Sequence, residues 1–209
     1  MDSWIDDSFE GKFVENKSYQ FTTDWFSGFI KNFERNLAQF KGTPAKFIEI
    51  GTYEGRSTVW LLDNILTHPQ AQLHSIDPYP KPLFFSNAKQ AGVLDEATGM
   101  ARGLTFYASK SVEVLRQLPM NTFDFVYVDG DHSTSAALQD AVLSFALLKE
   151  GGILAFDDYL WNDWKNDKYG TTKLGIDAFM TVFRNELEVL GRGYQVWVRK
   201  VRDRRAVSL

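Results

Sequence analysis

Acidic residues follow two apolar runs of the sequence, at positions where neighbouring strands of a sheet would end. Asp129 and Asp131 come directly after FVYV. Asp157 and Asp158 come directly after ILAF. Because neighbouring parallel strands end side by side, we expect Asp129, Asp157 and Asp158 to converge at one edge of the sheet. Carboxylates this close repel one another unless a cation lies among them or some of them take up protons.

Oxygen ligands without thiolates suit a hard divalent cation, and Mg²⁺ above all. The sequence therefore predicts that Asp129, Asp157 and Asp158 bind Mg²⁺. The alternative is that Asp131 and Asp158 are solvated loop acids or helix N-caps. His132 lies beside the predicted metal site and is a candidate general base, with a structural or surface role as its alternative.

A turn that contains two glycines follows the run KFIEI. In the segment EIGTYEGRS, Gly51 and Gly55 let the backbone turn sharply and approach a ligand closely. Tyr53 and Ser57 stand where a dinucleotide-binding fingerprint would carry glycines, and the Gly-Lys-Ser/Thr of a phosphate-binding loop is absent. An ordinary tight turn between a strand and a helix explains the two glycines equally well.

Polar residues also follow the second and third predicted strands. Asp77 comes after the second strand, where a carboxylate can accept hydrogen bonds from both hydroxyls of a ribose. Its alternative role is to cap the proline-rich turn that follows. Ser109 and Ser111 come after the third strand, where they are either helix N-caps or hydroxyls near the edge of an adenine.

Four strand-then-helix units in succession position these residues. Apolar periodicity and turn residues predict strands over 46–50, 73–76, 104–107, 123–128, 153–156 and 194–201, and helices over 22–40, 56–66, 112–118, 133–148 and 174–187. Prolines predict an irregular segment over 78–103, and residues 205–209 are predicted as a last antiparallel strand. Because parallel strands need helical crossovers, the fold class is α/β: a doubly wound, mostly parallel sheet with an antiparallel C-terminal strand or hairpin.

The composition limits the class of protein. The chain has 209 residues, no cysteine and a formal charge of −4. These values are typical of one compact unit without disulfides, with residues 1–44 as an N-terminal arm and helix packed on a domain of residues 45–209. The charge argues against a nucleic-acid partner, and no apolar run is long enough to span a membrane. The acidic start lacks the layout of a signal peptide, so we expect a cytoplasmic protein, and a homo-oligomer is left open.

Several of these segments together resemble a known family. The runs FIEIGTYEGRSTVWL, SIDPY, FDFVYVDGDHSTSAALQDAVLSFALLKEGGILAFDDY and GYQVWVRK resemble the class I S-adenosylmethionine-dependent methyltransferases, which have a Rossmann-like fold. The resemblance covers roughly residues 45–201. Within that class, DGDH followed by GGILAFDDY is most similar to the macrocin-type sugar O-methyltransferases and the cephalosporin-biosynthesis methyltransferase-like proteins.

The resemblance implies a role for each of the candidate residues. Glu49, Gly51 and Gly55 would hold the methionine part of S-adenosylmethionine, Asp77 its ribose, and Ser111 or its neighbours its adenine. The remaining residues assigned to the cofactor site are Thr52, Tyr53, Ser57, Ser109 and Asp129. In metal-dependent members, the positions of Asp129, Asp157 and Asp158 carry the acids that bind the metal.

The predicted function is transfer of a methyl group from S-adenosylmethionine to a hydroxyl of a small molecule, assisted by Mg²⁺, with His132 as the general base. One alternative is a metal-independent methyltransferase that acts on another acceptor. Two others are an NAD-dependent oxidoreductase and a non-catalytic nucleoside-binding module. The incomplete glycine fingerprint argues against the oxidoreductase, and the three converging carboxylates argue against the binding module.

Overall fold

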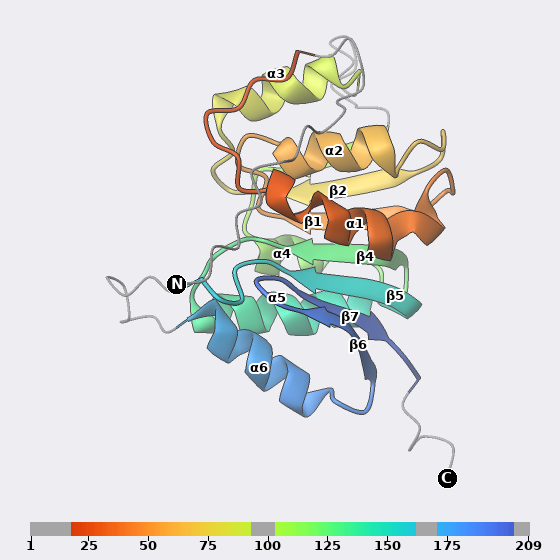
Figure 1. Ribbon diagram of the computed structural model, residues 1–209, viewed down its shortest axis with the longest axis vertical. Coiled ribbons are helices and arrows are strands. Elements are labelled where there is room, and N and C mark those ends of the chain that lie inside the picture. Colours follow the sequence, from red (N-terminus) through yellow and green to blue (C-terminus); the bar gives the residue numbers. More distant parts are fainter. Residues whose placement is uncertain (1–17, 93–102, 162–170, 203–209) are drawn as a thin grey trace.

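A seven-stranded sheet forms the centre of the structure, with the strand order β3-β2-β1-β4-β5-β7-β6 (Figure 1). The computed structural model describes residues 18–92, 103–161 and 171–202. The first five strands are parallel to one another, and β7 is antiparallel to both β5 and β6. This confirms the predicted doubly wound, mostly parallel sheet with an antiparallel hairpin at its C-terminal side.

The central strands β1 and β4 are short apolar segments that are buried on both faces, as expected for the parallel sheet of an α/β fold, whereas the edge strands β3 and β6 are more exposed. Their bounds are β1 Lys46–Ile50, β2 Gln72–Ile76, β3 Leu104–Tyr107, β4 Phe123–Val128, β5 Leu148–Phe156, β6 Leu187–Arg192 and β7 Val196–Lys200.

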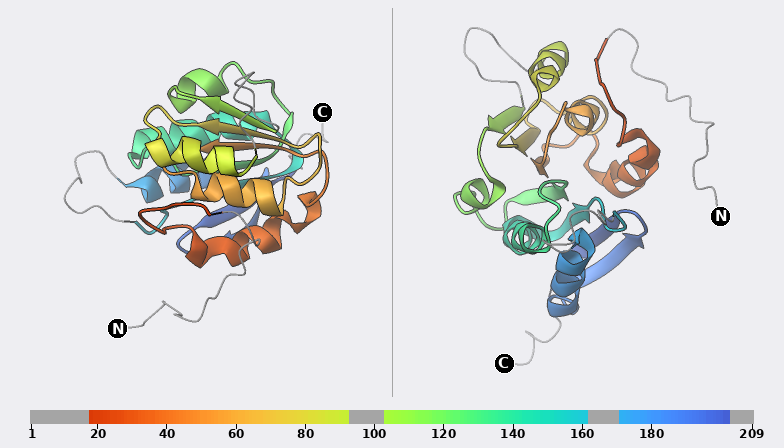
Figure 2. Two further views of the ribbon diagram at one scale, coloured as in Figure 1. Left: turned by 90° about the horizontal axis from the view of Figure 1, so that it is seen from above. Right: turned by 90° about the vertical axis from the view of Figure 1, so that its left-hand side faces the viewer.

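Helices cover both faces of this sheet (Figure 2). On one face lie α1 (Ile30–Leu37), α2 (Arg56–Asn64) and α3 (Pro82–Gln90), and on the other lie α4 (Ser111–Leu115), α5 (Thr134–Leu147) and α6 (Thr172–Val182). Along β4 the side chains alternate between these layers. Phe125 and Tyr127 pack with α1 and α2, while Val126 and Val128 pack with α4, α5 and α6.

The prediction of an irregular segment over 78–103 is wrong for its middle part, because residues 82–90 form α3. Pro82 occupies the start of this helix, where a proline costs nothing because its missing N–H would have no partner within the helix. The prolines therefore mark where the helix begins and do not extend the loop. Residues 93–102 lie outside the described residues.

The predicted helix over 22–40 is also interrupted. Two short 3₁₀ turns, η1 (Ser27–Phe29) and η2 (Ala38–Phe40), flank α1. The carboxylate of Asp24 accepts hydrogen bonds from the backbone N–H groups of Phe26 and Ser27, so residues 22–26 lead into the helical segment instead of belonging to it.

The C-terminal hairpin differs most from its prediction. The predicted helix over 174–187 ends at Val182, and residues 187–192 form β6, which pairs with β7. The hairpin partner therefore precedes β7 instead of following it. Local propensity cannot decide this pairing, because β6 exists only through its hydrogen bonds to a strand that follows it. The predicted strand over 205–209 lies outside the described residues.

The N-terminal segment packs on the domain that follows it. Phe33 and Leu37 of α1 are completely buried against the sheet. Residues 1–17 of the predicted N-terminal arm lie outside the described residues. No helix in the described part of the chain is both long enough and apolar enough to cross a bilayer.

The register of the parallel strands places their carboxyl ends at one level. Ile50 of β1 pairs with both Ile76 of β2 and Val128 of β4, and Val128 pairs in turn with Phe156 of β5. The residues that follow these four strands are therefore neighbours. Ligands of open α/β sheets bind at this edge, beside the point where the strand order reverses.

Candidate functional site

A cavity of about 1270 Å³ opens at this edge of the sheet. Most of the residues singled out from the sequence line it. These are Gly51, Thr52, Tyr53, Ser57, Asp77, Ser111, Asp129, His132, Asp157 and Asp158. Three do not: Glu49, Gly55 and Ser109. The hydroxyl of Ser109 instead donates a hydrogen bond to Glu113, 2.6 Å away in the next helical turn.

Gly51 allows the ends of β1 and β4 to come together. Its φ is +87°, and a Cβ at this position would lie 1.9 Å from the carbonyl oxygen of Asp129. Gly55, the residue before α2, also has a positive φ, of +82°. Tyr53 adopts φ +48° without being a glycine. Both glycines are therefore needed for the backbone conformation of the turn, and Gly51 also for close approach.

Glu49, at the end of β1, fixes the position of the segments around this turn. It is completely buried, and the hydroxyls of Ser57, Thr58 and Ser75 donate hydrogen bonds to its carboxylate. Burial raises the pKa of Glu49, and the three hydroxyl donors act in the opposite direction. Glu49 thus ties β1 to the first turn of α2 and to β2.

Asp77 joins the ends of β1 and β2. Its Oδ2 accepts hydrogen bonds from the backbone N–H groups of Thr52 and Tyr53, each at 3.0 Å, and its Oδ1 accepts one from Tyr79 at 2.7 Å. Asp77 therefore caps the proline-rich turn, as the structural alternative required, and also holds the glycine-containing turn while facing the cavity. Its contact with a ribose stays a prediction.

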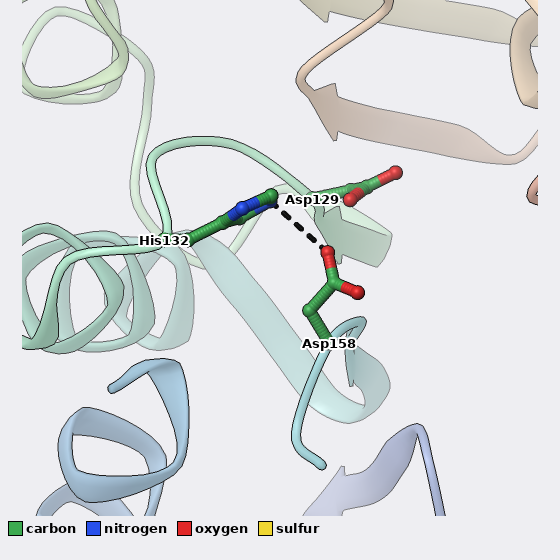
Figure 3. Close-up of side chains that lie close together, drawn as sticks. All are labelled: Asp129, His132 and Asp158. Carbon is green, nitrogen blue, oxygen red and sulfur yellow. Dashed lines mark ion pairs between the residues drawn. The ribbon is translucent and has the colours of Figure 1, made fainter. Parts of the chain in front are cut away.

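Asp129, His132 and Asp158 form a cluster on the other side of the cavity (Figure 3). One ligand atom from each lies within 4.8 Å of the others. Nε2 of His132 is 3.0 Å from Oδ2 of Asp158. Asp158 has φ +55°, a backbone conformation that is uncommon for an aspartate.

The protonation of this cluster reflects burial and mutual repulsion. Burial raises the pKa of Asp129 well above its ordinary value, and the negative charges of Asp157 and Asp158 raise it further. The hydrogen bond to Asp158 raises the pKa of His132, against the opposing effect of burial. A group of acids with these properties favours either protons or a cation.

Three donors hold the carboxylate of Asp157. The hydroxyl of Tyr127, the side-chain amide of Gln195 at 3.1 Å and the backbone N–H of Asp158 at 2.8 Å all donate to its carboxylate. The role of Asp157 as a metal ligand stays a prediction. Neither Tyr127 of β4 nor Gln195, which directly precedes β7, was identified from the sequence, because both lie in segments that look like ordinary core strands.

Aromatic residues complete the wall of the cavity. Phe29 stacks on Tyr194, with ring centroids 5.4 Å apart, and the hydroxyl of Tyr194 donates to Oδ1 of Asp158 at 2.9 Å. Trp25 lies against Tyr53, and Trp161 against His132. Trp161 follows Asp158 closely along the chain, and residues 162–170 after it lie outside the described residues. The sequence did not single out Trp25, Phe29 and Tyr194, which only tertiary structure brings here from the N-terminal segment and the C-terminal hairpin.

Comparison with known sequences gives one family match. A family model described as a methyltransferase domain matches residues 48–159, more than half of the chain. A protein of Acanthamoeba polyphaga mimivirus, described as the uncharacterized protein R132, is 29% identical over 133 residues. That alignment covers 62% of this chain and 58% of the viral protein.

Comparison with solved structures shows the same fold in methyltransferases. MycE, a methyltransferase of the mycinamycin biosynthetic pathway solved with Mg and SAH, superposes with a TM-score of 0.62 at 17% identity. The match covers 87% of this chain but only 52% of MycE. A candidate O-methyltransferase from Klebsiella pneumoniae superposes with a TM-score of 0.59 at 18% identity, covering 83% of this chain and 79% of that protein. This chain thus spans about half the length of MycE.

Proposed function

This chain belongs to the methyltransferase-domain family, and on that premise we propose that it transfers a methyl group from S-adenosylmethionine to a hydroxyl of a small molecule, with the help of Mg²⁺. One observation carries the proposal. The turn at Gly51, the carboxylate of Asp77 and the cluster of Asp129, His132 and Asp158 all face one cavity. The relatives solved with Mg and SAH support it through their shared fold. The narrower resemblance to sugar O-methyltransferases is part of the proposal.

The cofactor side of the cavity is the turn after β1 and its surroundings. S-adenosylmethionine supplies an electrophilic methyl group when it is bound. Gly51 lines this part of the cavity, and we assign the carboxylate of Asp77, which lines it as well, to the hydroxyls of the ribose. We assign Ser111, which lines the cavity at the start of α4, to the adenine end.

The acid cluster fits a hard divalent cation. Its ligand atoms are within 4.8 Å of one another, and burial, together with the charges of Asp157 and Asp158, raises the pKa of Asp129, so a positive charge there would stabilise the ionised carboxylate. We assign Asp129, Asp157 and Asp158 as its ligands. A cation there would lower the pKa of a hydroxyl that coordinates it.

His132 is placed to move the proton of the acceptor. When Nε2 carries a proton and donates it to Asp158, the lone pair of Nδ1 is free to take a proton from a hydroxyl. The ring of Trp161, with its centroid 4.6 Å from that of the imidazole, restricts its orientation. Aromatic side chains around the opening give an acceptor an apolar surface to bind and keep water away.

A metal-independent methyltransferase is the second candidate function. The observation that favours it is that both oxygens of Asp158 already have protein partners, namely His132 and Tyr194. In this alternative, Asp158 orients His132 as a general base and no cation is needed. Methyl transfer that survives EDTA would support the alternative.

Isothermal titration calorimetry tests the proposal at both ends of the cavity. We expect S-adenosylhomocysteine to bind and NADH not to bind. We also expect Mg²⁺ to bind the S-adenosylhomocysteine complex of the wild type, and to bind at least about tenfold more weakly to Asp158→Asn because a charged ligand is lost. Glu188→Gln, an exposed acid of β6, is the control that should leave Mg²⁺ binding unchanged.

Two results would contradict the proposal. Binding of NADH in preference to S-adenosylhomocysteine would indicate that the protein is an oxidoreductase. Equal Mg²⁺ affinity in the wild type and Asp158→Asn would remove the metal site from the function. From the sequence we also propose that the protein is cytoplasmic and has no nucleic-acid or membrane partner. Whether it forms a homo-oligomer is left open.

A further inference from the structure

Gln195 is a buried polar residue to which the proposed mechanism gives no role. It directly precedes β7 and is only 3% exposed. Its side-chain oxygen accepts hydrogen bonds from the indole N–H of Trp197 and from the side-chain amide of Asn32, each at 3.1 Å. Its side-chain nitrogen donates to Oδ2 of Asp157, also at 3.1 Å. An amide that is buried and bonded at both ends has little freedom to turn, so it holds Asp157 from one fixed direction.

The indole of Trp197 determines which end of the amide faces Asp157. An indole N–H can only donate a hydrogen bond, so the oxygen of Gln195 must face it. Asn32 of α1 donates to the same oxygen. The NH₂ group is therefore left for Asp157, and it can only donate to that carboxylate. The donor beside Asp157 is thus fixed by residues of β7 and α1.

The hydrogen bonds around Asp157 leave its two oxygens unequal. Each oxygen of a carboxylate offers two lone pairs. Oδ2 accepts from both the hydroxyl of Tyr127 and the amide of Gln195, so both of its lone pairs are used. Oδ1 accepts from the backbone N–H of Asp158 at 2.8 Å and keeps one lone pair. Asp157 lines the cavity, and within the described part of the chain its hydrogen bonds leave only Oδ1 for a ligand there.

We propose that Gln195 and Tyr127 are positioning residues that restrict Asp157 to binding a cation through one oxygen, and that this restriction favours Mg²⁺ over Ca²⁺. Ca²⁺ takes more oxygen ligands than Mg²⁺ and accepts a carboxylate through both oxygens, whereas Mg²⁺ needs a near-ideal octahedron. A carboxylate with one available oxygen therefore deprives Ca²⁺ of a ligand that Mg²⁺ does not need. The inference rests on the proposed function and adds the residues that discriminate between the two cations.

A purely structural role for these two residues predicts a different result. If Tyr127 and Gln195 only stabilise the segment after β5, replacing them weakens the binding of both cations by a similar factor or changes neither. The ratio of the Mg²⁺ and Ca²⁺ affinities therefore separates the two roles, because a general loss of order at the site lowers both affinities together.

Dissociation constants for MgCl₂ and CaCl₂ are measured by calorimetry on the S-adenosylhomocysteine complex. We expect the wild type to bind Mg²⁺ more tightly than Ca²⁺. Tyr127→Phe and Gln195→Met each remove one donor to Oδ2 and keep a side chain of similar size. The preference for Mg²⁺ should therefore fall about fivefold or more in each variant, because Oδ2 becomes available to Ca²⁺.

Tyr107→Phe is the matched control. It removes the same hydroxyl from β3 of the same sheet, where Tyr107 bonds to Nδ1 of His74 at 2.9 Å and does not line the cavity. The preference for Mg²⁺ should stay that of the wild type. If Gln195→Met does not fold, Tyr127→Phe decides the question, because it removes one oxygen and keeps the ring that contacts Phe33.

An unchanged preference in Tyr127→Phe overturns the inference, and so does an equal fall in Tyr107→Phe. A wild type that binds Mg²⁺ without preferring it to Ca²⁺ overturns the inference as well, while leaving the proposed function intact. A wild type that binds neither cation overturns the Mg²⁺-assisted function and the inference together.

Discussion

Gly51 is the residue whose replacement tests the backbone geometry of the site most directly. Two features oppose a side chain at this position. The φ of Gly51 is positive, and a Cβ would lie only 1.9 Å from the carbonyl oxygen of Asp129. We expect Gly51→Ala to lower the free energy of unfolding by about 3 kcal/mol or more and to abolish binding of S-adenosylhomocysteine. Urea denaturation and calorimetry measure the two effects.

Gly151→Ala is the control for this prediction. Gly151 also has a positive φ, of +82°, but nothing lies within 4 Å of a Cβ placed there. Only the backbone strain remains, so we expect a loss of about 1–2 kcal/mol and unchanged ligand binding. Equal losses in the two variants would show that the close approach of β1 and β4 is unimportant.

The buried carboxyl of Asp140, on α5, gives a prediction about the pH dependence of stability. Burial raises its pKa from 3.8 to about 6, so the folded protein binds a proton more tightly than the unfolded chain does. This contribution to stability is complete below pH 3.8 and is lost as the pH rises through 6. We expect the free energy of unfolding to fall by up to about 3 kcal/mol over this range, and this fall to be absent in Asp140→Asn.

Urea denaturation of the wild type and Asp140→Asn at pH 4.5, 5.5 and 7 measures the difference. We expect the difference in free energy of unfolding between the two proteins to change with pH. A constant difference would mean that Asp140 has the same pKa in the folded and unfolded chains.

At the scale of elements, polar contacts help to hold the segment over 18–25 on the domain. Asn87 of α3 accepts a hydrogen bond from the backbone N–H of Gln20 and donates to the carbonyls of Gln20 and Glu54, each at 2.9 Å. Both oxygens of Glu54 accept hydrogen bonds from Thr22. Trp25 continues this segment to the wall of the cavity.

We expect Asn87→Ala to release this segment without unfolding the sheet, because the variant loses three hydrogen bonds and leaves buried backbone groups without partners. Amide hydrogen exchange should accelerate at least about tenfold over residues 20–25 and stay unchanged in β1 and β4. Ser86→Ala is the control, since that hydroxyl bonds only within its own helix to Leu83. Equal acceleration throughout the chain would contradict the prediction.

The whole molecule has two apolar layers separated by the sheet. Phe33 belongs to the layer under α1 and α2, and Phe179 to the layer under α5 and α6. Because they share no partners, we expect the losses of stability in Phe33→Leu and Phe179→Leu to add within about 0.5 kcal/mol. The rings of Phe33 and Trp197 meet edge-on, with their centroids 4.8 Å apart. The losses of stability in Phe33→Leu and Trp197→Phe should therefore not be additive. Urea denaturation of the single and double variants measures both couplings.

Much of this architecture follows from the sequence alone. The apolar runs that form β1, β4 and the end of β5 are buried on both faces, and burial of this kind needs a continuous apolar segment. The turn residues between them mark where each strand gives way to a helix. The sequence therefore predicts that the residues following the strands meet at one edge of the sheet.

Long-range pairing decided the rest. The strand β6 and the interruption of the helix over 22–40 depend on partners that are distant along the chain or on a side-chain cap, and local propensity does not contain them. The same holds within the site, where Asp157 is turned toward Tyr127 and Gln195, and Asp158 toward His132 and Tyr194. Residue type and spacing along the sequence determined which carboxylates meet at the edge of the sheet. Which way each carboxylate points was decided only by tertiary structure, because hydrogen-bond donors compete for it from strands that the sequence does not show to be neighbours.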